Sequence, residues 1–231
     1  MRHWLALLPI LVACKVKDPP AINAPFYDGF ERTELGDSYR VTGEGYRIVN
    51  GQLSAKGAHN HPLWLARKLP RNVRIEFDTF STSPRGDIKV ELFGDGTSFD
   101  PDRGAYMATG YELIFGGWGN SKSIIARLDE HGKDVVQRVD VKVVPNRHYY
   151  WRIERDKTNT IRWWIRDGKQ GEGKRDAGQA GSAGSAGAAM TEPPFLELKD
   201  PNPLEGSGHE FFAFNNWETD TWFDNLVITP L

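Results

Sequence analysis

A single cysteine, Cys14, occurs among the 231 residues, which excludes an intrachain disulfide and a zinc site built from several thiolates. An excess of positive charge is absent too, because 29 Lys and Arg stand against 31 Asp and Glu. We therefore expect no nucleic-acid partner, since such proteins carry a strongly basic face. The apolar run at residues 4–13 is shorter than the roughly 20 residues that a bilayer-spanning helix needs.

No segment of about ten or more residues shows apolar side chains at the 3.6-residue spacing of an amphipathic helix. Residues 147–168 show instead the alternation of a β-hairpin. Tyr149, Trp151 and Ile153 share one face before a polar turn at 156–159, and Ile161, Trp163 and Ile165 share it after the turn. Trp164 faces the other way, toward solvent, a second sheet or a ligand. Many such short runs separated by turn residues predict an all-β fold, a two-sheet antiparallel β-sandwich.

The expected strands continue in this pattern along the chain. The turn Asn50-Gly51 between two apolar-alternating runs is a strong hairpin signal. A flexible Gly-, Ala- and Ser-rich insert is expected at residues 170–191, within a single domain that covers 26–231. Outside the 147–168 hairpin, the predicted strands are 26–31, 46–49, 52–55, 62–69, 73–81, 87–93, 111–115, 123–128, 135–144, 195–198, 210–217 and 221–229.

The start of the chain has the size and pattern of an export signal. Residues 1–13 combine a basic start with a short apolar run, and Leu11-Val12-Ala13-Cys14 resembles a bacterial lipobox. That resemblance implies cleavage before Cys14, its acylation and anchoring to an extracytoplasmic membrane face. Lys15 after the cysteine favours the outer membrane where the cell has two. Residues 14–25 then form a tether. The alternative is an ordinary cleaved signal peptide with an incidental cysteine.

Four segments carry a family resemblance: FYDGFE at 26–31, VRIEFDTF at 73–80, the 147–168 hairpin and FFAFNNWETDTWFDNLVI at 211–228. Their order is similar to the concanavalin A-like lectin and glucanase jelly rolls, and within them to laminin G-like and keto-disaccharide hydrolase domains. The resemblance implies two curved antiparallel sheets with a ligand on the concave face or its rim loops.

The same resemblance raises a catalytic hypothesis. Glucanases of this fold place carboxylates at alternating positions on one strand, and Glu76 and Asp78 alternate here. The further glutamate of the motif is missing, since Phe80 follows. We therefore interpret Glu76 and Asp78 as a solvated strand face. A glycoside hydrolase or lyase remains the competing hypothesis, with Glu91 and Glu112 on neighbouring strands as additional candidates.

The leading hypothesis is a monomeric, non-catalytic glycan-binding domain. Trp118 lies between glycines and cannot easily bury itself, and aromatic faces beside amides suit sugar rings. A purely structural envelope protein whose aromatic residues form the core is the third alternative. The candidate ligand-binding residues are Arg85, Trp118, Asn120, Trp164, Asn216 and Trp217.

Metal sites have less support in the sequence. His59 and His61 flank Asn60, but no third ligand is identifiable, so an exposed loop is the preferred interpretation. The family resemblance implies a structural Ca²⁺ where the terminal strands meet, with Asp28 and Asp224 as the nearest carboxylates. A calcium ion needs six or more oxygen ligands, and the sequence identifies only these two residues as ligands. No other cofactor is expected.

Overall fold

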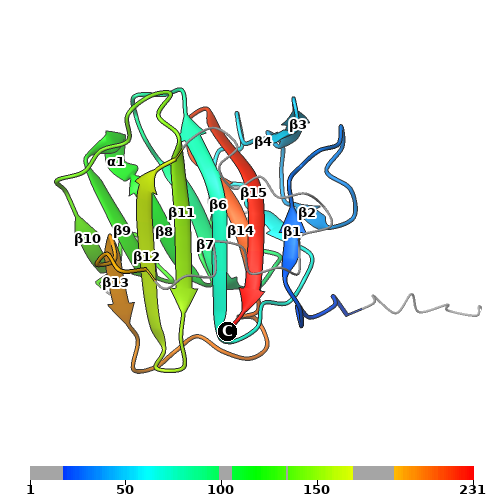
Figure 1. Ribbon diagram of the computed structural model, residues 1–231, viewed down its shortest axis with the longest axis vertical. Helices are drawn as coiled ribbons and strands as arrows, with labels where there is room; N and C mark the ends of the chain where they lie inside the picture. Colours follow the sequence, from blue (N-terminus) through cyan, green and yellow to red (C-terminus); the bar gives the residue numbers. More distant parts are fainter. Residues whose placement is uncertain (1–17, 99–105, 134, 169–189) are drawn as a thin grey trace, which may run out of the picture.

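The computed structural model describes residues 18–98, 106–133, 135–168 and 190–231. Cys14 and nearly all of the predicted insert at 170–191 lie outside the described residues. Within them, two antiparallel sheets pack face to face, which confirms the predicted β-sandwich (Figure 1). Among the described residues, no helix is long and apolar enough to cross a membrane.

The first sheet has eight strands and contains the predicted aromatic hairpin. β1 (Phe26–Asp28) pairs with β15 outside the main path. The other seven lie in the order β13 (Leu196–Lys199), β12 (Thr160–Asp167), β11 (Tyr149–Arg155), β6 (Val73–Ser81), β15 (Thr221–Pro230), β4 (Gln52–Ser54) and β3 (Arg47–Val49).

The second sheet has seven strands, and the four-residue helix α1 (Gly117–Asn120) follows one of them. Figure 1 shows β7, β8 and β14 lying behind β6, β11 and β15 of the first sheet. The order is β10 (Val135–Arg138), β9 (Lys122–Arg127), β8 (Tyr111–Gly116), β7 (Ile88–Gly94), β14 (Phe211–Asn216), β5 (Leu63–Leu65) and β2 (Tyr39–Val41).

The core lies between the two sheets and is rich in aromatic rings. Trp151 and Trp163 of the hairpin are fully buried there, as the alternation predicts. Phe77 of β6 lies edge-on to Phe214 of β14 at 5.7 Å between ring centroids. Such pairs stabilise the sandwich beyond the area that they bury. The inward-facing residues of both sheets therefore form one continuous core.

The strand predictions are confirmed for most elements. Asn50 and Gly51 have φ values of 52° and 72°, as a two-residue hairpin between β3 and β4 requires. β6 has the bounds that the sequence predicts. The edge strand β2 was not predicted, because Tyr39–Val41 gives too short a pattern to separate from a loop. The predicted strand at 135–144 ends at Arg138.

The predicted tether at 14–25 contains a segment that packs on the domain, at residues 20–22. Ile22 is buried, and its N–H donates to the Lys68 carbonyl at 2.9 Å. Ala21 forms a parallel bridge with Lys68. Residues 20–22 therefore belong to the folded domain, because an apolar side chain and a neighbouring backbone edge are available to them.

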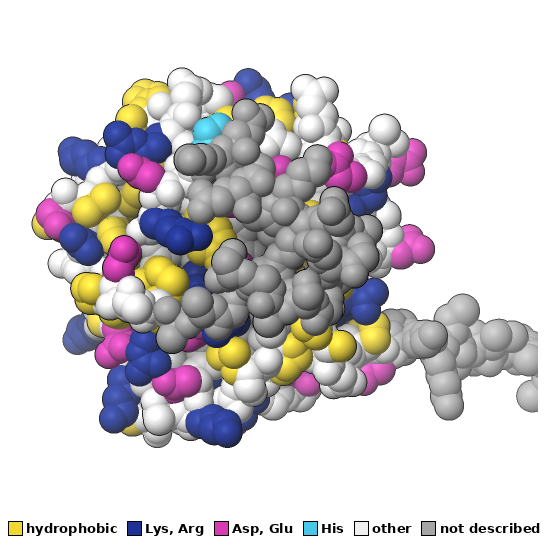
Figure 2. Space-filling model, in the orientation of Figure 1, with side chains coloured by type: hydrophobic (Ala, Val, Ile, Leu, Met, Phe, Trp, Pro, Cys, Tyr) yellow, Lys and Arg dark blue, Asp and Glu magenta, His cyan; other side chains and the backbone are white. Residues whose placement is uncertain are grey.

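The face of the eight-stranded sheet carries both signs of charge. In Figure 2, the coloured part of this face shows Lys and Arg interspersed with Asp and Glu. This agrees with the near balance of the composition and gives this part of the surface no strong field of one sign.

Candidate functional site

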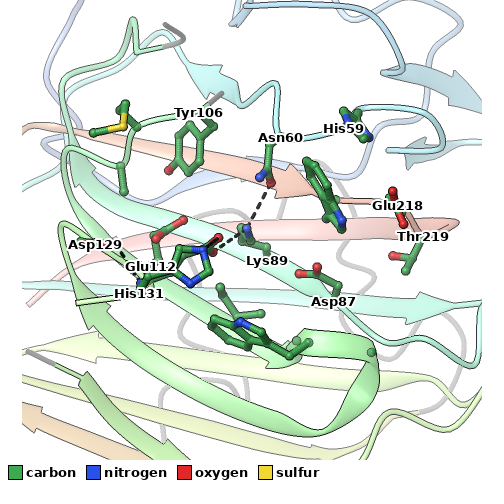
Figure 3. A pocket seen from close by; sticks show the side chains of 18 of the residues that line it. His59, Asn60, Asp87, Lys89, Tyr106, Glu112, Asp129, His131, Glu218 and Thr219 are labelled. Atoms are coloured by element: carbon green, nitrogen blue, oxygen red, sulfur yellow. Dashed lines mark hydrogen bonds and ion pairs between the residues drawn. The ribbon is translucent and has the colours of Figure 1, made fainter. Parts of the chain in front are cut away.

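A cavity of about 620 Å³ lies on the outer face of the seven-stranded sheet. Its floor comes from β7 and β8, where Ile88, Val90 and Leu92 point into the core and leave the alternate side chains on the outer face. Lys89, Glu112 and Ile114 line this floor, and loops around it form the walls. Figure 3 shows Lys89 in the middle of the site, with Asp87 to one side and Glu112 and His131 to the other.

Lys89 is a buried cation at the floor, with 2% of its side chain exposed. Its ammonium donates to Glu130 Oε2 at 2.8 Å and to Asn60 Oδ1 at 3.1 Å. Burial lowers the pKa of Lys89, but the carboxylates of Asp87, Glu112 and Glu130 raise it by more, so the pKa lies above its usual value. Lys89 therefore stays charged and fixes Asn60 and Glu130 in the walls.

Glu112 is a buried carboxyl group on the same floor. Only 1% of it is exposed, and its Oε1 has no hydrogen-bond partner among the described residues. Burial raises the pKa of Glu112 well above its usual value, although Lys89 acts in the opposite direction. Asp87 has a similar setting: burial raises its pKa, Lys89 lowers it, and its Oδ1 also has no partner in the described chain. The pocket thus holds acceptor capacity that the protein does not use.

Two partly exposed tryptophans stand at the rim. Trp217, 38% exposed, stacks on His59 with ring centroids 4.0 Å apart. Trp118, 36% exposed, lies in the short turn α1 with φ at 52°, in the left-handed region. The Lys122 ammonium lies 3.8 Å from the Trp118 ring centroid. Both rings are held by a protein group, and both line the pocket.

The structure brings three of the six predicted ligand-binding residues to this pocket. Arg85, Trp118 and Trp217 all line it, and Arg85 also forms an ion pair with Glu218 at 3.4 Å. Of the histidine segment, His59 and Asn60 line the pocket, whereas His61 does not.

The other three predicted ligand-binding residues have structural roles. The Asn120 amide donates to the carbonyls of Pro84 and Val143. Asn216 is buried and bonds to Ala55 and Thr219. Trp164 is on β12 of the other sheet, and its Nε1 donates to the Glu192 carbonyl at 3.0 Å. None of the three lines the described pocket.

Glu76 and Asp78 lie on β6, in the sheet opposite the pocket. They are 3% and 5% exposed, so the predicted solvated strand face is wrong. The reason is that the strands on either side supply buried partners. Glu76 accepts a hydrogen bond from the Tyr150 hydroxyl of β11, and Asp78 accepts one from the Asn225 amide of β15 at 2.8 Å.

The alternating polar pattern that faces the pocket is on β7, and sequence reasoning overlooked most of it. Asp87, directly before the strand, and Lys89 and Glu91 within it alternate with core residues, and this spacing was the available signal. Lys89 occupies the central position of the three. Glu91 is buried beneath the Tyr106 hydroxyl and the backbone N–H groups of Thr109 and Gly110. Glu91 does not line the pocket, so Asp87 and Glu91 do not form the carboxylate pair that glycoside hydrolysis uses.

Among the described residues, no group of three or more His, Cys, Asp or Glu side chains is placed to hold a metal ion. The Asp28 carboxylate accepts from Arg32 at 2.6 and 2.9 Å and from the Tyr39 hydroxyl at 2.8 Å. Asp224 lies opposite Asp78, and burial raises its pKa to about 6. The two candidate calcium ligands thus have different surroundings, and a structural calcium ion stays a prediction.

No protein-family model and no curated protein matches the chain, whereas solved structures match its fold. A protein of unknown function with a galectin-like fold from Bacillus subtilis gives a TM-score of 0.56 at 13% identity, over 88% of this chain and 94% of that one. A carbohydrate-binding module from the same organism gives a TM-score of 0.53 at 9% sequence identity, over 86% of this chain and 97% of that one. A prokaryotic lichenase from a mouse hindgut metagenome gives a TM-score of 0.53 at 8% sequence identity, over 90% of this chain and 100% of that one.

The fold is a galectin-like jelly roll. This agrees with the concanavalin A-like resemblance at the level of architecture. Identities this low establish the fold alone, and one such fold supports many activities, so function has to be argued from the pocket.

Proposed function

We propose that this protein binds carbohydrate, and that the pocket rimmed by Trp118 and Trp217 is its glycan site. The observation that carries the proposal is one cavity that combines two partly exposed tryptophan rings with floor carboxylates whose acceptors are unused. Sugar rings stack on aromatic faces, and their hydroxyl groups need fixed hydrogen-bond partners. The fold neighbours named as a carbohydrate-binding module and a lichenase support the same class of ligand.

The cellular setting of this jelly roll is the second part of the proposal. The lipobox at residues 11–14 supports acylation of Cys14, which would hold a monomeric, glycan-binding domain on the outside of a bacterial membrane. We also propose that the domain belongs to the laminin G-like branch of the concanavalin A-like folds.

A glycan array probed with the purified protein tests the binding function. We expect specific hits, and we expect Trp217→Ala to lower the affinity for them about tenfold or more, because a stacking face is lost. Trp222→Ala is the matched control, since Trp222 stacks on Phe80 on the other sheet. A folded protein that binds no glycan would overturn the proposal and favour a structural envelope role.

A glycoside hydrolase is the second candidate, and Glu112 is the observation that favours it. A buried carboxyl group with a raised pKa is what a general acid requires. Release of reducing sugar from a bound glycan, abolished by Glu112→Gln, would establish hydrolysis. Binding without any turnover leaves the pocket as a binding site.

A further inference from the structure

The pocket carries more acidic than basic side chains. Two of its carboxylates are matched by cations: Lys89 lies 2.8 Å from Glu130, and Arg85 lies 3.4 Å from Glu218. No ion pair to Asp87, Glu112 or Asp129 occurs within the described part of the chain. The acidic lining residues are Asp87, Glu112, Asp129, Glu130 and Glu218, and the basic ones are Arg85 and Lys89, with His59 and His131 beside them.

Glu112 gives an independent indication of what the pocket binds. It is 1% exposed and faces the cavity from the middle of the sheet, where its cross-strand neighbours are Glu91 and Ala126. Neither neighbour donates to its Oε1, which has no partner among the described residues. A buried acceptor left unpaired costs free energy, and a ligand that donates to it recovers that cost.

The surplus of carboxylates separates the classes of glycan. Uronic acids and sulfated or phosphorylated sugars would bring negative charge into a pocket lined by more acidic than basic side chains, which disfavours them. A neutral hydroxyl donates one hydrogen bond and leaves the charge surplus as it is. An ammonium group donates three hydrogen bonds, and its positive charge opposes the effect of burial on the pKa of Glu112, so that binding favours the carboxylate form.

We propose that the pocket selects a sugar with a free amine, an unacetylated amino-hexose, whose ammonium group binds the Glu112 carboxylate with Asp87 nearby in the same cavity. This inference rests on the proposed glycan-binding function and names the substrate class of that site. Charge-assisted hydrogen bonds are worth more than neutral ones, so the amine raises affinity about tenfold over the matching hydroxyl.

Calorimetric titration of the purified protein tests the inference. The probes are glucosamine and galactosamine oligomers, their N-acetylated forms, and the neutral glucose and galactose oligomers of the same length and linkage. We expect the free-amine forms to bind about tenfold tighter than the other two. Glu112→Gln should reduce that preference to about threefold or less, because the amide keeps the shape of the side chain and loses its charge.

Glu34→Gln is the matched control, because it removes the same charge from an exposed loop residue. It should leave the preference unchanged. Equal or weaker binding of the amine forms would overturn the inference and leave the glycan-binding function standing. Binding of none of the sugars would overturn both. Retention of the amine preference in Glu112→Gln would also overturn the assignment to Glu112.

Discussion

Glu91 is a carboxyl group enclosed by its own neighbours. It is fully buried on β7, and its Oε1 accepts from the N–H groups of Thr109 and Gly110 at 2.9 and 2.6 Å. Burial raises its pKa to about 8, although these hydrogen bonds act in the opposite direction. Because the unfolded chain has an ordinary pKa near 4.5 at this position, the folded protein binds more protons between these two values.

This sets the direction of a pH effect on stability. The contribution of Glu91 is fully present below about pH 4.5 and is lost as pH rises through about 8, by at most about 1.4 kcal/mol per pH unit. Glu91→Gln mimics the protonated form, so we expect a shallower fall of the unfolding free energy over this range. Urea unfolding at several pH values measures it. Glu34→Gln should keep the wild-type dependence of the unfolding free energy on pH. The same dependence in Glu91→Gln would contradict the assignment of this pH effect to Glu91.

Single residues also mark where sequence reasoning succeeds and fails. Trp118 and Trp217 could be predicted at the site, because each follows or precedes turn residues that prevent burial of a large ring. Asn120 and Asn216 could not be separated from them, because an amide beside a turn serves either a ligand or the backbone. The choice depends on which carbonyls lie near it, such as those of Val143 and Ala55, and these come from distant parts of the chain.

At the scale of elements, the wall of the pocket that carries His59 and Asn60 depends on a close backbone approach. Gly45 has φ at 107°, and a Cβ there would lie 2.3 Å from the Ala58 nitrogen. The chain after Ala58 takes positive φ values at His59 and Asn60 and reaches the pocket, where Asn60 accepts from Lys89. The loop can hold this shape because Gly45 leaves space for it.

We therefore expect Gly45→Ala to destabilise the protein by about 2–4 kcal/mol, through the combined cost of backbone strain and a clash with backbone. It should also weaken glycan binding, because His59 and Asn60 move with Ala58. Denaturant unfolding and titration measure the two effects. Gly36→Ala is the control: its φ is 70°, with nothing within 4 Å of the added Cβ, so strain alone should cost about 1 kcal/mol. Equal losses of unfolding free energy in Gly45→Ala and Gly36→Ala would contradict a backbone clash at position 45.

The elements themselves were largely readable from the sequence, whereas their placement was not. Alternation identified β6 and β7 and the inward side of each. It did not tell which strand lies in which sheet. Glu76 and Asp78 of β6 were therefore considered for catalysis, whereas Lys89 of β7 and the preceding Asp87 line the pocket. That assignment follows from pairings between strands far apart in the chain, such as β6 with β15 and β7 with β14.

At the scale of the whole molecule, we expect the proposed membrane anchor to be separable from the fold. Cys14 lies outside the described residues, and the domain has begun by residues 20–22. We expect Cys14→Ser to move the protein from the membrane fraction to the soluble one without changing its melting temperature, because only the acyl attachment is lost. Fractionation and acyl labelling measure this. Lys15→Ser keeps the cysteine and should stay with membranes, and a Cys14→Ser variant that resists a high-salt wash would contradict acylation.

β14 and β15 occupy inner positions in the two sheets. β15 lies between β6 and β4 and also holds β1, and β14 lies between β7 and β5. Until both have been synthesised, a nascent chain has no template that joins its N-terminal strands to the remainder of either sheet. Folding of the domain thus awaits β14 and β15, with long-range contacts that form slowly. A chain truncated just before β14 is therefore expected to fold as poorly as one truncated early in the domain.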